Sequence, residues 1–427
     1  MLHSCFGARK WRGVAVACTA SLGVAFQVHG STIDRDYRLG DNSALSTENG
    51  VANAVVGSGV GSDHSGFTLD HAGLLTTLPT FQDLEPFGAP TYVNVGAGGL
   101  ARPGAAAGSL GVAFDGVDDH LRGLGFGNPG QGDDPYQETI SYNGLFTRAV
   151  QGWVRPTAAA AANQRQRVVR DTFRFGVSIV ADAQGANHWA LNTDGLTGGL
   201  EVVSSSAVPL NQWSHVMHYT NGNASALYVN GIAVTAKVGG YYDNGATVAE
   251  KSIVLGADIT SDGDTVTASN YFKGQMDDFQ VLVAGNNSTQ TAGANYGAFN
   301  LGVDNQFVAQ QGLTIGDVTG DGLITGNGTG GANDDVKKFI ENFRYTQRIN
   351  GVVVGDLNTR TQHADLNFDG VTDLRDWYIL ANAHVDAGSL DIASLLASHS
   401  VPEPSALALA SIVAVSAGVL RKHRRTR

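Results

Sequence analysis

Between residues 31 and 305, apolar and polar residues alternate in short runs that are separated by Gly, Asn, Asp and Ser. Side chains that alternate in this way lie on opposite faces of a β-strand, and runs of this length between turn residues are typical of sandwiches. Helical spacing is scarce in this region. The predicted strands are residues 112–114, 149–154, 176–181, 200–203, 252–255 and 279–283. The pattern predicts an antiparallel β-sandwich, so the expected fold class is mainly β.

Three further runs, at residues 213–220, 226–229 and 232–234, are joined by Asn221-Gly222 and Asn230-Gly231. Both central residues of a type I′ turn have positive φ, and an Asn-Gly pair adopts that conformation at low cost. These residues therefore predict three consecutive antiparallel strands.

The pattern changes after residue 312, where acidic loops alternate with helical segments. One loop, residues 365–376, has oxygen-bearing side chains at positions 1, 3, 5, 9 and 12 and Gly370 at position 6. This is the spacing of a calcium-binding loop, in which alternate side chains converge on one ion and position 7 donates a backbone carbonyl. The predicted calcium ligands are Asp365, Asn367, Asp369, Val371 through its carbonyl oxygen, Asp373 and Asp376.

An upstream copy of this loop starts at Asp317 and is interrupted. Position 12 falls on Gly328, but the insertion of residues 326–333 can loop out and let Asp335 complete the site. The predicted ligands of this first loop are Asp317, Thr319, Asp321, Leu323 through its carbonyl oxygen, Thr325 and Asp335. Calcium is thus the expected cofactor.

Five segments before these loops follow the order found in a known module, at residues 114–121, 151–156, 211–216, 227–231 and 274–279. The first reads Phe-Asp-Gly-Val-Asp-Asp-His-Leu and the second Gln-Gly-Trp-Val-Arg-Pro. They resemble the laminin-G-like, concanavalin-A-like jelly roll, and we place this domain at residues 31–305. The resemblance implies two antiparallel sheets. Lectins, adhesion modules and glycosidases all use this fold, so it does not fix the function by itself.

Each acidic loop is followed by a helical segment, at residues 335–343 and 376–383. The pair resembles the type I dockerin, and we place this domain at residues 312–399. The resemblance implies a fold that depends on calcium and a cohesin-like protein as partner. Family contacts to cohesin centre on loop positions 10 and 11, where this chain has Leu374-Arg375 in place of the frequent Ser-Thr. A cohesin-docking module and a calcium-stabilised spacer without cohesin both remain open.

The sandwich region also has to be tested for catalysis. Retaining hydrolases of this fold use two carboxylates about 5 Å apart, placed on one strand face by a Glu-x-Asp-x-x-Glu pattern. Between residues 90 and 285 the Glu residues are Glu138, Glu201 and Glu250, and none has that context. The Asp277-Asp278 pair is expected to point to opposite faces of a strand. We therefore expect no enzyme, with a secreted polysaccharide hydrolase as the alternative.

Sugar binding without catalysis would use exposed aromatic rings together with a few polar groups. Trp153 and Trp213 lie in predicted strands and are expected in the core, because Trp is highly buried on average. Trp189, which follows Asn187 and His188, is the candidate for stacking on a sugar ring.

Residues 1–30 have the layout of a secretory signal peptide. Arg9, Lys10 and Arg12 precede an uncharged stretch at residues 13–26. That stretch is too short to span about 30 Å of hydrocarbon, which argues against a permanent anchor. We expect export and removal of the segment by signal peptidase.

The other end of the chain, residues 401–427, begins with the motif Pro402-Glu403-Pro404. An apolar run at residues 406–420 and a basic end follow. These features resemble the PEP-CTERM sorting signal of Gram-negative bacteria. The resemblance implies that an exosortase removes the tail, that membrane contact is transient, and that the protein reaches the cell surface or the extracellular matrix. A plain tail anchor is the alternative.

Charge and cysteine content narrow the function further. The net charge of -12 argues against nucleic acid as a partner, because nucleic-acid binding needs clustered Lys and Arg. Cys5 and Cys18 both lie in the signal peptide, so the mature chain is expected to have no disulfide. We expect an exported, surface-sorted, non-catalytic protein that binds calcium and a polysaccharide or extracellular matrix glycan. A purely structural matrix protein is the further alternative.

Overall fold

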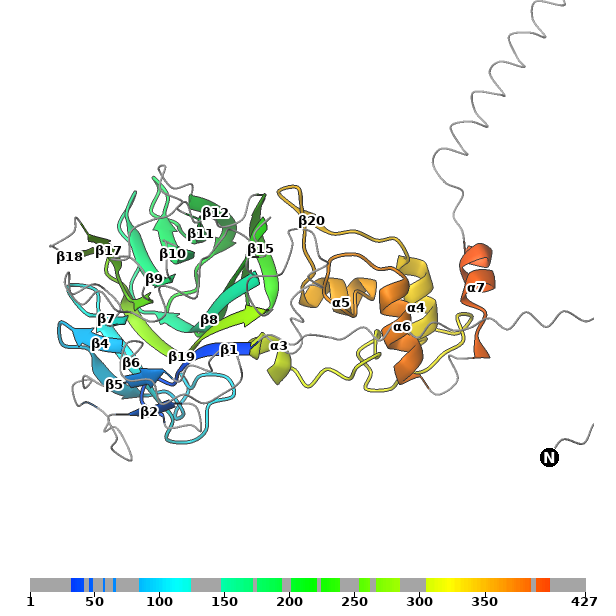
Figure 1. Ribbon diagram of the computed structural model, residues 1–427, viewed down its shortest axis with the longest axis horizontal. Helices are drawn as coiled ribbons and strands as arrows, with labels where there is room; N and C mark the ends of the chain where they lie inside the picture. Colours follow the sequence, from blue (N-terminus) through cyan, green and yellow to red (C-terminus); the bar gives the residue numbers. More distant parts are fainter. Residues whose placement is uncertain are drawn as a thin grey trace, which may run out of the picture.

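A β-sandwich lies beside a smaller C-terminal domain of helices and loops (Figure 1). The computed structural model describes residues 32–41, 46–48, 57, 64–66, 84–123, 147–171, 175–193, 201–220, 224–238, 253–261, 266–284, 305–384 and 389–399. Its antiparallel sheets confirm the predicted mainly β fold class. The predicted signal peptide and sorting signal lie outside the described residues.

One sheet of the sandwich has eight strands, in the order β15-β14-β13-β8-β19-β6-β5, and β1 also pairs with β19. These strands are β1 (Thr32–Tyr37), β5 (Thr91–Asn94), β6 (Leu110–Asp115), β8 (Thr147–Pro156), β13 (Ser214–Thr220), β14 (Ala224–Val229), β15 (Ile232–Val238) and β19 (Lys273–Ala284).

The other sheet has nine strands, in the order β12-β11-β10-β9-β16-β7-β4-β3-β2. They are β2 (Ser46–Glu48), β3 (His64–Gly66), β4 (Leu84–Phe87), β7 (His120–Gly123), β9 (Arg165–Asp171), β10 (Phe175–Ala181), β11 (Asn187–Thr193), β12 (Glu201–Ala207) and β16 (Val254–Leu255). A separate hairpin joins β17 (Asp258–Ser261) to β18 (Val266–Ser269).

The strands predicted from alternation are confirmed, since each overlaps a strand of the structure. The predicted run of antiparallel strands is β13, β14 and β15. Asn230 and Gly231, with φ of 50° and 75°, form the turn between β14 and β15, as the Asn-Gly pair predicts. The other predicted turn, at Asn221-Gly222, lies outside the described residues.

The main core lies between the two sheets. It includes Phe114, Val150, Val216, Phe279 and Val281 from the eight-stranded sheet and Val168, Val177, Ile179, Trp189 and Leu191 from the nine-stranded sheet. A Cβ atom at Gly152 of β8 would lie 2.6 Å from the ring of Phe279. Glycine at this position therefore lets the phenyl ring pack directly on the β8 backbone.

The C-terminal domain contains five helices and a short hairpin in its described residues. They are α3 (Gln306–Gln310), α4 (Asp335–Asn342), β20 (Arg348–Ile349), β21 (Val352–Val353), α5 (Leu357–His363), α6 (Leu374–Ala383) and α7 (Ile392–His399). Its own small core includes Val318, Val336, Phe339, Leu366 and Leu380. The hairpin and α5 lie between the two acidic loops, so the segment that joins them has regular structure.

The predicted helices of this domain are present with shifted ends. The first, α4, ends at Asn342, one residue before the predicted end. The second, α6, begins at Leu374 and not at Asp376, because Asp373 and Asp376 form a capping box at its start. The last three residues of the acidic loop thus belong to the first turn of the helix.

The two domains pack against each other through the outer face of the eight-stranded sheet. A buried cluster joins Met217, Tyr228 and Leu282 of the sandwich to Val308 and Phe368 of the C-terminal domain. Hydrogen bonds cross the same contact: the Ala233 amide donates to Asp356 Oδ2 over 3.2 Å, and the Leu357 amide donates to the Gly231 carbonyl over 3.0 Å. The loops of the C-terminal domain are therefore tied directly to the sandwich.

Within the part of the chain that the structure describes, no helix is both long and apolar enough to cross a membrane. The predicted membrane segment at residues 406–420 lies outside that part.

Candidate functional site

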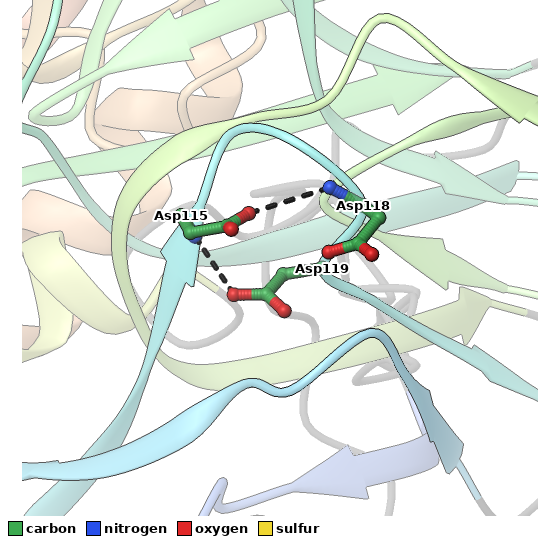
Figure 2. Close-up of side chains that lie close together, drawn as sticks. All are labelled: Asp115, Asp118 and Asp119. Carbon is green, nitrogen blue, oxygen red and sulfur yellow. Dashed lines mark hydrogen bonds between the residues drawn. The ribbon is translucent and has the colours of Figure 1, made fainter.

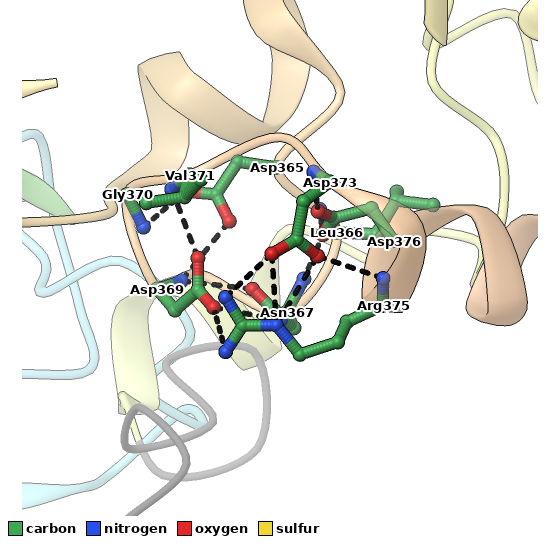
Figure 3. Close-up of polar contacts among 9 residues, drawn as sticks. All are labelled: Asp365, Leu366, Asn367, Asp369, Gly370, Val371, Asp373, Arg375 and Asp376. Atoms are coloured by element: carbon green, nitrogen blue, oxygen red, sulfur yellow. Dashed lines mark hydrogen bonds and ion pairs between the residues drawn. The ribbon is translucent and has the colours of Figure 1, made fainter. Parts of the chain in front are cut away.

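The second acidic loop begins after α5 and ends in the first turn of α6 (Figure 3). The carboxylate of Asp365 accepts hydrogen bonds from the amides of Asp369, over 3.0 Å, and Gly370, over 2.9 Å. At the other end, the carboxylate of Asp376 accepts from the amides of Leu366, over 2.7 Å, and Asp373, over 2.8 Å. The first and last acidic residues of the loop thus fold its backbone around their own side chains.

The remaining predicted side-chain ligands lie inside this turn. Asn367 Oδ1 accepts from the Asp369 amide over 3.0 Å, and Asp369 Oδ1 accepts from the Val371 amide over 2.9 Å. Asp373 and Asp369 both face the guanidinium of Arg375 (Figure 3). The predicted side-chain ligands of the second loop thus lie along one turn of chain, whereas the acidic group of described residues whose carboxylate oxygens all lie within 4.8 Å of one another is at Asp115, Asp118 and Asp119.

Burial governs the electrostatics of this loop. It raises the pKa of Asp365 to about 7, and repulsion from Asp376 and Asp369 adds to that effect. Burial also raises the pKa of Asp376 to about 7 and raises the pKa of Asp369. Buried carboxylates with raised pKa values gain from a nearby cation, and a set made only of oxygen atoms suits a hard one. The residues of the second loop therefore fit calcium.

The first loop repeats the backbone pattern of the second despite its insertion. Asp335 accepts from the amides of Val318 and Thr319, over 2.8 and 2.9 Å, and from the amide of Thr325 over 2.8 Å. Asp376 accepts from the amides at the same three positions of its own loop, at 2.7, 3.1 and 2.8 Å. The structure thus brings Asp335 to the place in the first loop that the sequence assigns to it.

The start of the first loop matches the second in part. Asp317 accepts from the amides of Gly320, over 2.6 Å, and Gly322, over 2.8 Å, at loop positions 4 and 6. Asp365 accepts from positions 5 and 6 of its own loop, so the bond to position 6 is the shared one. Asp321 is exposed and accepts from the Leu323 amide over 2.9 Å, while the Thr325 hydroxyl donates to the Asn333 carbonyl over 3.1 Å. The first loop is therefore the more open of the two.

The insertion in the first loop is organised around Asp334, the cap of α4. Its carboxylate accepts from the amides of Gly328, Gly330 and Lys337 at 3.1, 2.8 and 2.7 Å. These glycine-rich residues surround an open depression that Asp334 helps to line. Amides of the insertion thus bind the Asp334 carboxylate, while the Asp335 carboxylate binds the backbone of the first loop.

A third acidic group was not recognised from the sequence as a cluster. Asp115 ends β6, and Asp118 and Asp119 lie in the turn before β7; their carboxylate oxygens lie within 4.8 Å of one another (Figure 2). Asp119 accepts from the amides of Asp115, over 2.8 Å, and Ala89, over 2.6 Å, and Asp115 accepts from the Val117 amide over 2.7 Å. The carboxylates of Asp115 and Asp119 thus accept hydrogen bonds from backbone amides, and these bonds stabilise the turn within residues 114–121.

The expectation that Asp277 and Asp278 point to opposite faces is wrong. β19 has a bulge in this region, and Asp278 has a φ of 49°, so the alternation of the strand is broken. Asp277 bonds Arg102 Nε, and Asp278 Oδ2 lies 2.7 Å from Arg102 Nη2. Burial raises the pKa of Asp277 well above its ordinary value, and the Asp278 charge adds to it. Both carboxylates are buried against one guanidinium.

The expectations for the tryptophans are corrected in two cases. Trp153 is buried, as predicted, at the contact with Phe307 of α3. Trp189, the predicted sugar-stacking side chain, has no exposed surface, because its strand points it between the sheets. Trp213 precedes β13, is only half-buried, and donates from Nε1 to the Leu100 carbonyl over 2.9 Å. The partly exposed tryptophan among these three is therefore Trp213.

Comparison with known proteins supports the fold of the sandwich. Residues 137–283 match the laminin-G-type model of the concanavalin A-like lectin/glucanases superfamily. This part of the chain thus has the jelly-roll fold of lectins and glucanases, in agreement with the resemblance seen in the sequence. A comparison with curated proteins gave no match.

Solved structures with low similarity were also found. One is domain 4 of AbnA, an extracellular GH43 arabinanase from Geobacillus stearothermophilus, solved in complex with arabinotriose. It is 14% identical to this chain, and the match covers 60% of this chain and 94% of that one with a TM-score of 0.32. A heptameric SAP-like pentraxin from Limulus polyphemus is 17% identical over 40% and 73%, with a TM-score of 0.27. The CBM40 of a Ruminococcus gnavus IT-sialidase, bound to α2,3 sialyllactose, is 15% identical over 33% and 77%, with a TM-score of 0.24. Similarity at this level carries no argument about the ligand.

Proposed function

We propose that the chain is an exported, surface-sorted, non-catalytic protein. Its sandwich binds a polysaccharide or extracellular matrix glycan, and its C-terminal domain binds calcium. The observation that carries the calcium assignment is the shared geometry of the two loops, in which Asp335 and Asp376 hold the same three backbone positions. The glycan assignment is supported by the match of residues 137–283 to a superfamily of lectins and glucanases.

Calcium would be held in the second loop by the side chains of Asp365, Asn367, Asp369, Asp373 and Asp376 and by the Val371 carbonyl. When bound, it supplies the positive charge that the buried carboxylates of the loop favour. Because the same carboxylates also hold the loop backbone, calcium binding would stabilise the folded domain by mass action. In this proposal calcium has a structural role, and no chemical step depends on it.

The non-catalytic assignment is supported by how the described acidic residues of the sandwich are used. Asp277 and Asp278 are both bound by Arg102, and Asp278 also by Arg38. In the cluster at the end of β6, Asp115 and Asp119 accept hydrogen bonds from backbone amides. A retaining hydrolase needs one carboxylate free to attack and another free to donate a proton. A secreted hydrolase and a purely structural matrix protein remain the alternative functions.

The partners and location follow from the sequence resemblances. A cohesin-like protein is a further partner in this proposal, with Leu374 and Arg375 at the two positions that the dockerin resemblance assigns to the contact. Signal peptidase would remove residues 1–30, and an exosortase would act at Pro402-Glu403-Pro404. The protein would then act at the surface or in the extracellular matrix of a Gram-negative bacterium.

The purified full chain can be tested on a glycan array with calcium and with a chelator. We expect binding to at least one glycan and no release of reducing sugar from the glycans that bind. Trp213→Ala tests the partly exposed tryptophan, and Trp189→Phe is the matched change at a buried one. Release of sugar would establish the hydrolase, whereas a chain that neither binds a glycan nor releases sugar would be a structural matrix component.

A further inference from the structure

Arg375 extends from the first turn of α6 back across the second acidic loop (Figure 3). Its Nη1 lies 2.6 Å from Asp369 Oδ2, and its Nη2 lies 2.8 Å from Asp373 Oδ2. Its Nε also donates to Asp373 over 3.1 Å. One guanidinium therefore bridges two carboxylates that lie four residues apart in the loop.

The two carboxylates that Arg375 bridges are both predicted calcium ligands. A carboxylate oxygen that accepts a hydrogen bond from the guanidinium is less available to a second cation. The guanidinium and a calcium ion would also repel each other at short range. An arginine guanidinium stays protonated at every working pH in any protein environment. The loop thus carries a permanent cation that belongs to its own chain.

The first loop offers an internal comparison. The residue just before Asp335, which corresponds to Arg375 before Asp376, is Asp334, and its carboxylate is held by the amides of the insertion. The nearby Lys337 ammonium donates to the Gly330 carbonyl over 3.1 Å and lies 3.9 Å from Glu341. Among the ion pairs of described residues, none joins a cation to Asp317, Asp321 or Asp335. The Arg360 guanidinium also lies near this loop and interacts electrostatically with Asp317 and Asp335, but its hydrogen bonds go to the Asp317 and Thr314 carbonyls. A guanidinium that bridges two predicted ligand carboxylates is therefore a feature of the second loop among the described residues.

We propose that Arg375 is a tethered cation that competes with calcium for Asp369 and Asp373 and so sets the calcium affinity of the second loop. Calcium binding displaces the guanidinium from both carboxylates. The second loop therefore binds calcium only at calcium concentrations high enough to displace the arginine. In the absence of calcium, the single charge of the arginine offsets part of the negative charge of Asp369 and Asp373. This inference rests on the proposed function, because it presupposes that the second loop binds calcium.

The test is calorimetric titration of the calcium-free full chain and of Arg375→Gln with calcium chloride. We expect the variant to bind calcium about tenfold more tightly at one site, because the competing charge-assisted hydrogen bonds are gone. Arg375→Lys should fall between the two, since it keeps the charge and loses the planar fork. Arg348→Gln is the matched control, because that exposed arginine donates to the Gly351 carbonyl and lies outside the loop.

A second readout needs no variant. The NMR signal of the Arg375 Nε proton in the wild-type chain should shift on addition of calcium toward that of a solvent-exposed arginine. Unchanged or weaker calcium binding by Arg375→Gln, or an Nε signal that stays fixed while calcium binds, would overturn the inference and leave the calcium assignment intact. A wild-type chain and a variant that both bind no calcium would overturn the proposed function, and the inference with it.

Discussion

Phe368 connects the second acidic loop to the β-sandwich, and its truncation tests whether the two domains act as one unit. The side chain is 4% exposed and belongs to the buried cluster that contains Met217 and Tyr228 of the outer sheet face. It contributes no oxygen to the loop and has a φ of 58°, which alanine would share. Phe368→Ala therefore removes an interdomain contact and leaves the predicted ligands in place.

The magnitude follows from burial. Replacing a core Phe by Ala costs about 3–5 kcal/mol, from lost apolar contact and the cavity that remains. Phe368 packs partly on its own domain, so we assign roughly half of this cost, about 2 kcal/mol, to the contact with the sandwich. A cost of about 1.4 kcal/mol is a factor of ten, so the undocked population should rise about thirtyfold.

Hydrogen exchange at two amides measures this opening. The Ala233 amide donates to Asp356, and the Leu357 amide donates to the Gly231 carbonyl, so both protons are protected only while the domains are docked. We expect both to exchange faster in Phe368→Ala, while amides of the ladder between β8 and β13 keep their rates. Leu374→Ala, at a side chain that is 56% exposed, is the matched control. Equal protection of the two interface amides in a folded Phe368→Ala protein would refute the coupling.

Three further predictions concern the acidic loops. Gly370→Ala should destabilise the domain more than Gly322→Ala. The two glycines have φ values of 83° and 84°, so alanine is equally strained at both, but a Cβ at Gly370 would lie 2.6 Å from the Val354 backbone and one at Gly322 would meet nothing within 4 Å. Equal melting temperatures of the two variants would contradict this prediction. Without calcium, the stability of the domain should fall as pH rises from about 4 to about 7. Asp365 and Asp376 have pKa values of about 7 in the folded state, so over this pH range the folded chain binds more protons than the unfolded chain. Saturating calcium should remove that slope in urea titrations, and a slope of opposite sign would be inconsistent with the burial of these carboxylates. Asp376→Asn should weaken calcium binding at one site by at least tenfold and lower the melting temperature in calcium, since a charged ligand is lost; unchanged affinity by calorimetry would exclude this residue as a ligand.

Local patterns predicted much of this structure. Alternation located the strands, and Asn230-Gly231 located a turn, because side-chain direction and positive φ are properties of a few consecutive residues. The acidic loops were predicted in the same way, from the spacing of oxygen-bearing side chains within one short segment. The structure places Asp335 against the backbone of the first loop across the insertion, and its role as a calcium ligand stays a prediction.

Side-chain surroundings were less predictable. Trp189 was expected at the surface and is fully buried, because two sheets close over its strand. Asp277 and Asp278 were expected on opposite faces and meet one arginine, because a bulge breaks the alternation. Each error concerns a contact between segments that are far apart in the sequence.

The sequence by itself determined the class of fold and the strand positions, and it predicted the oxygen donors of the two loops, since these depend on spacing within one segment. Only the tertiary structure decided that Phe368 ties the second loop to the sandwich and that Arg375 lies across its carboxylates. A bridging guanidinium depends on a side-chain rotamer, and a domain contact depends on which sheet face is left uncovered. Neither the rotamer nor the uncovered sheet face can be deduced from the spacing of neighbouring residues.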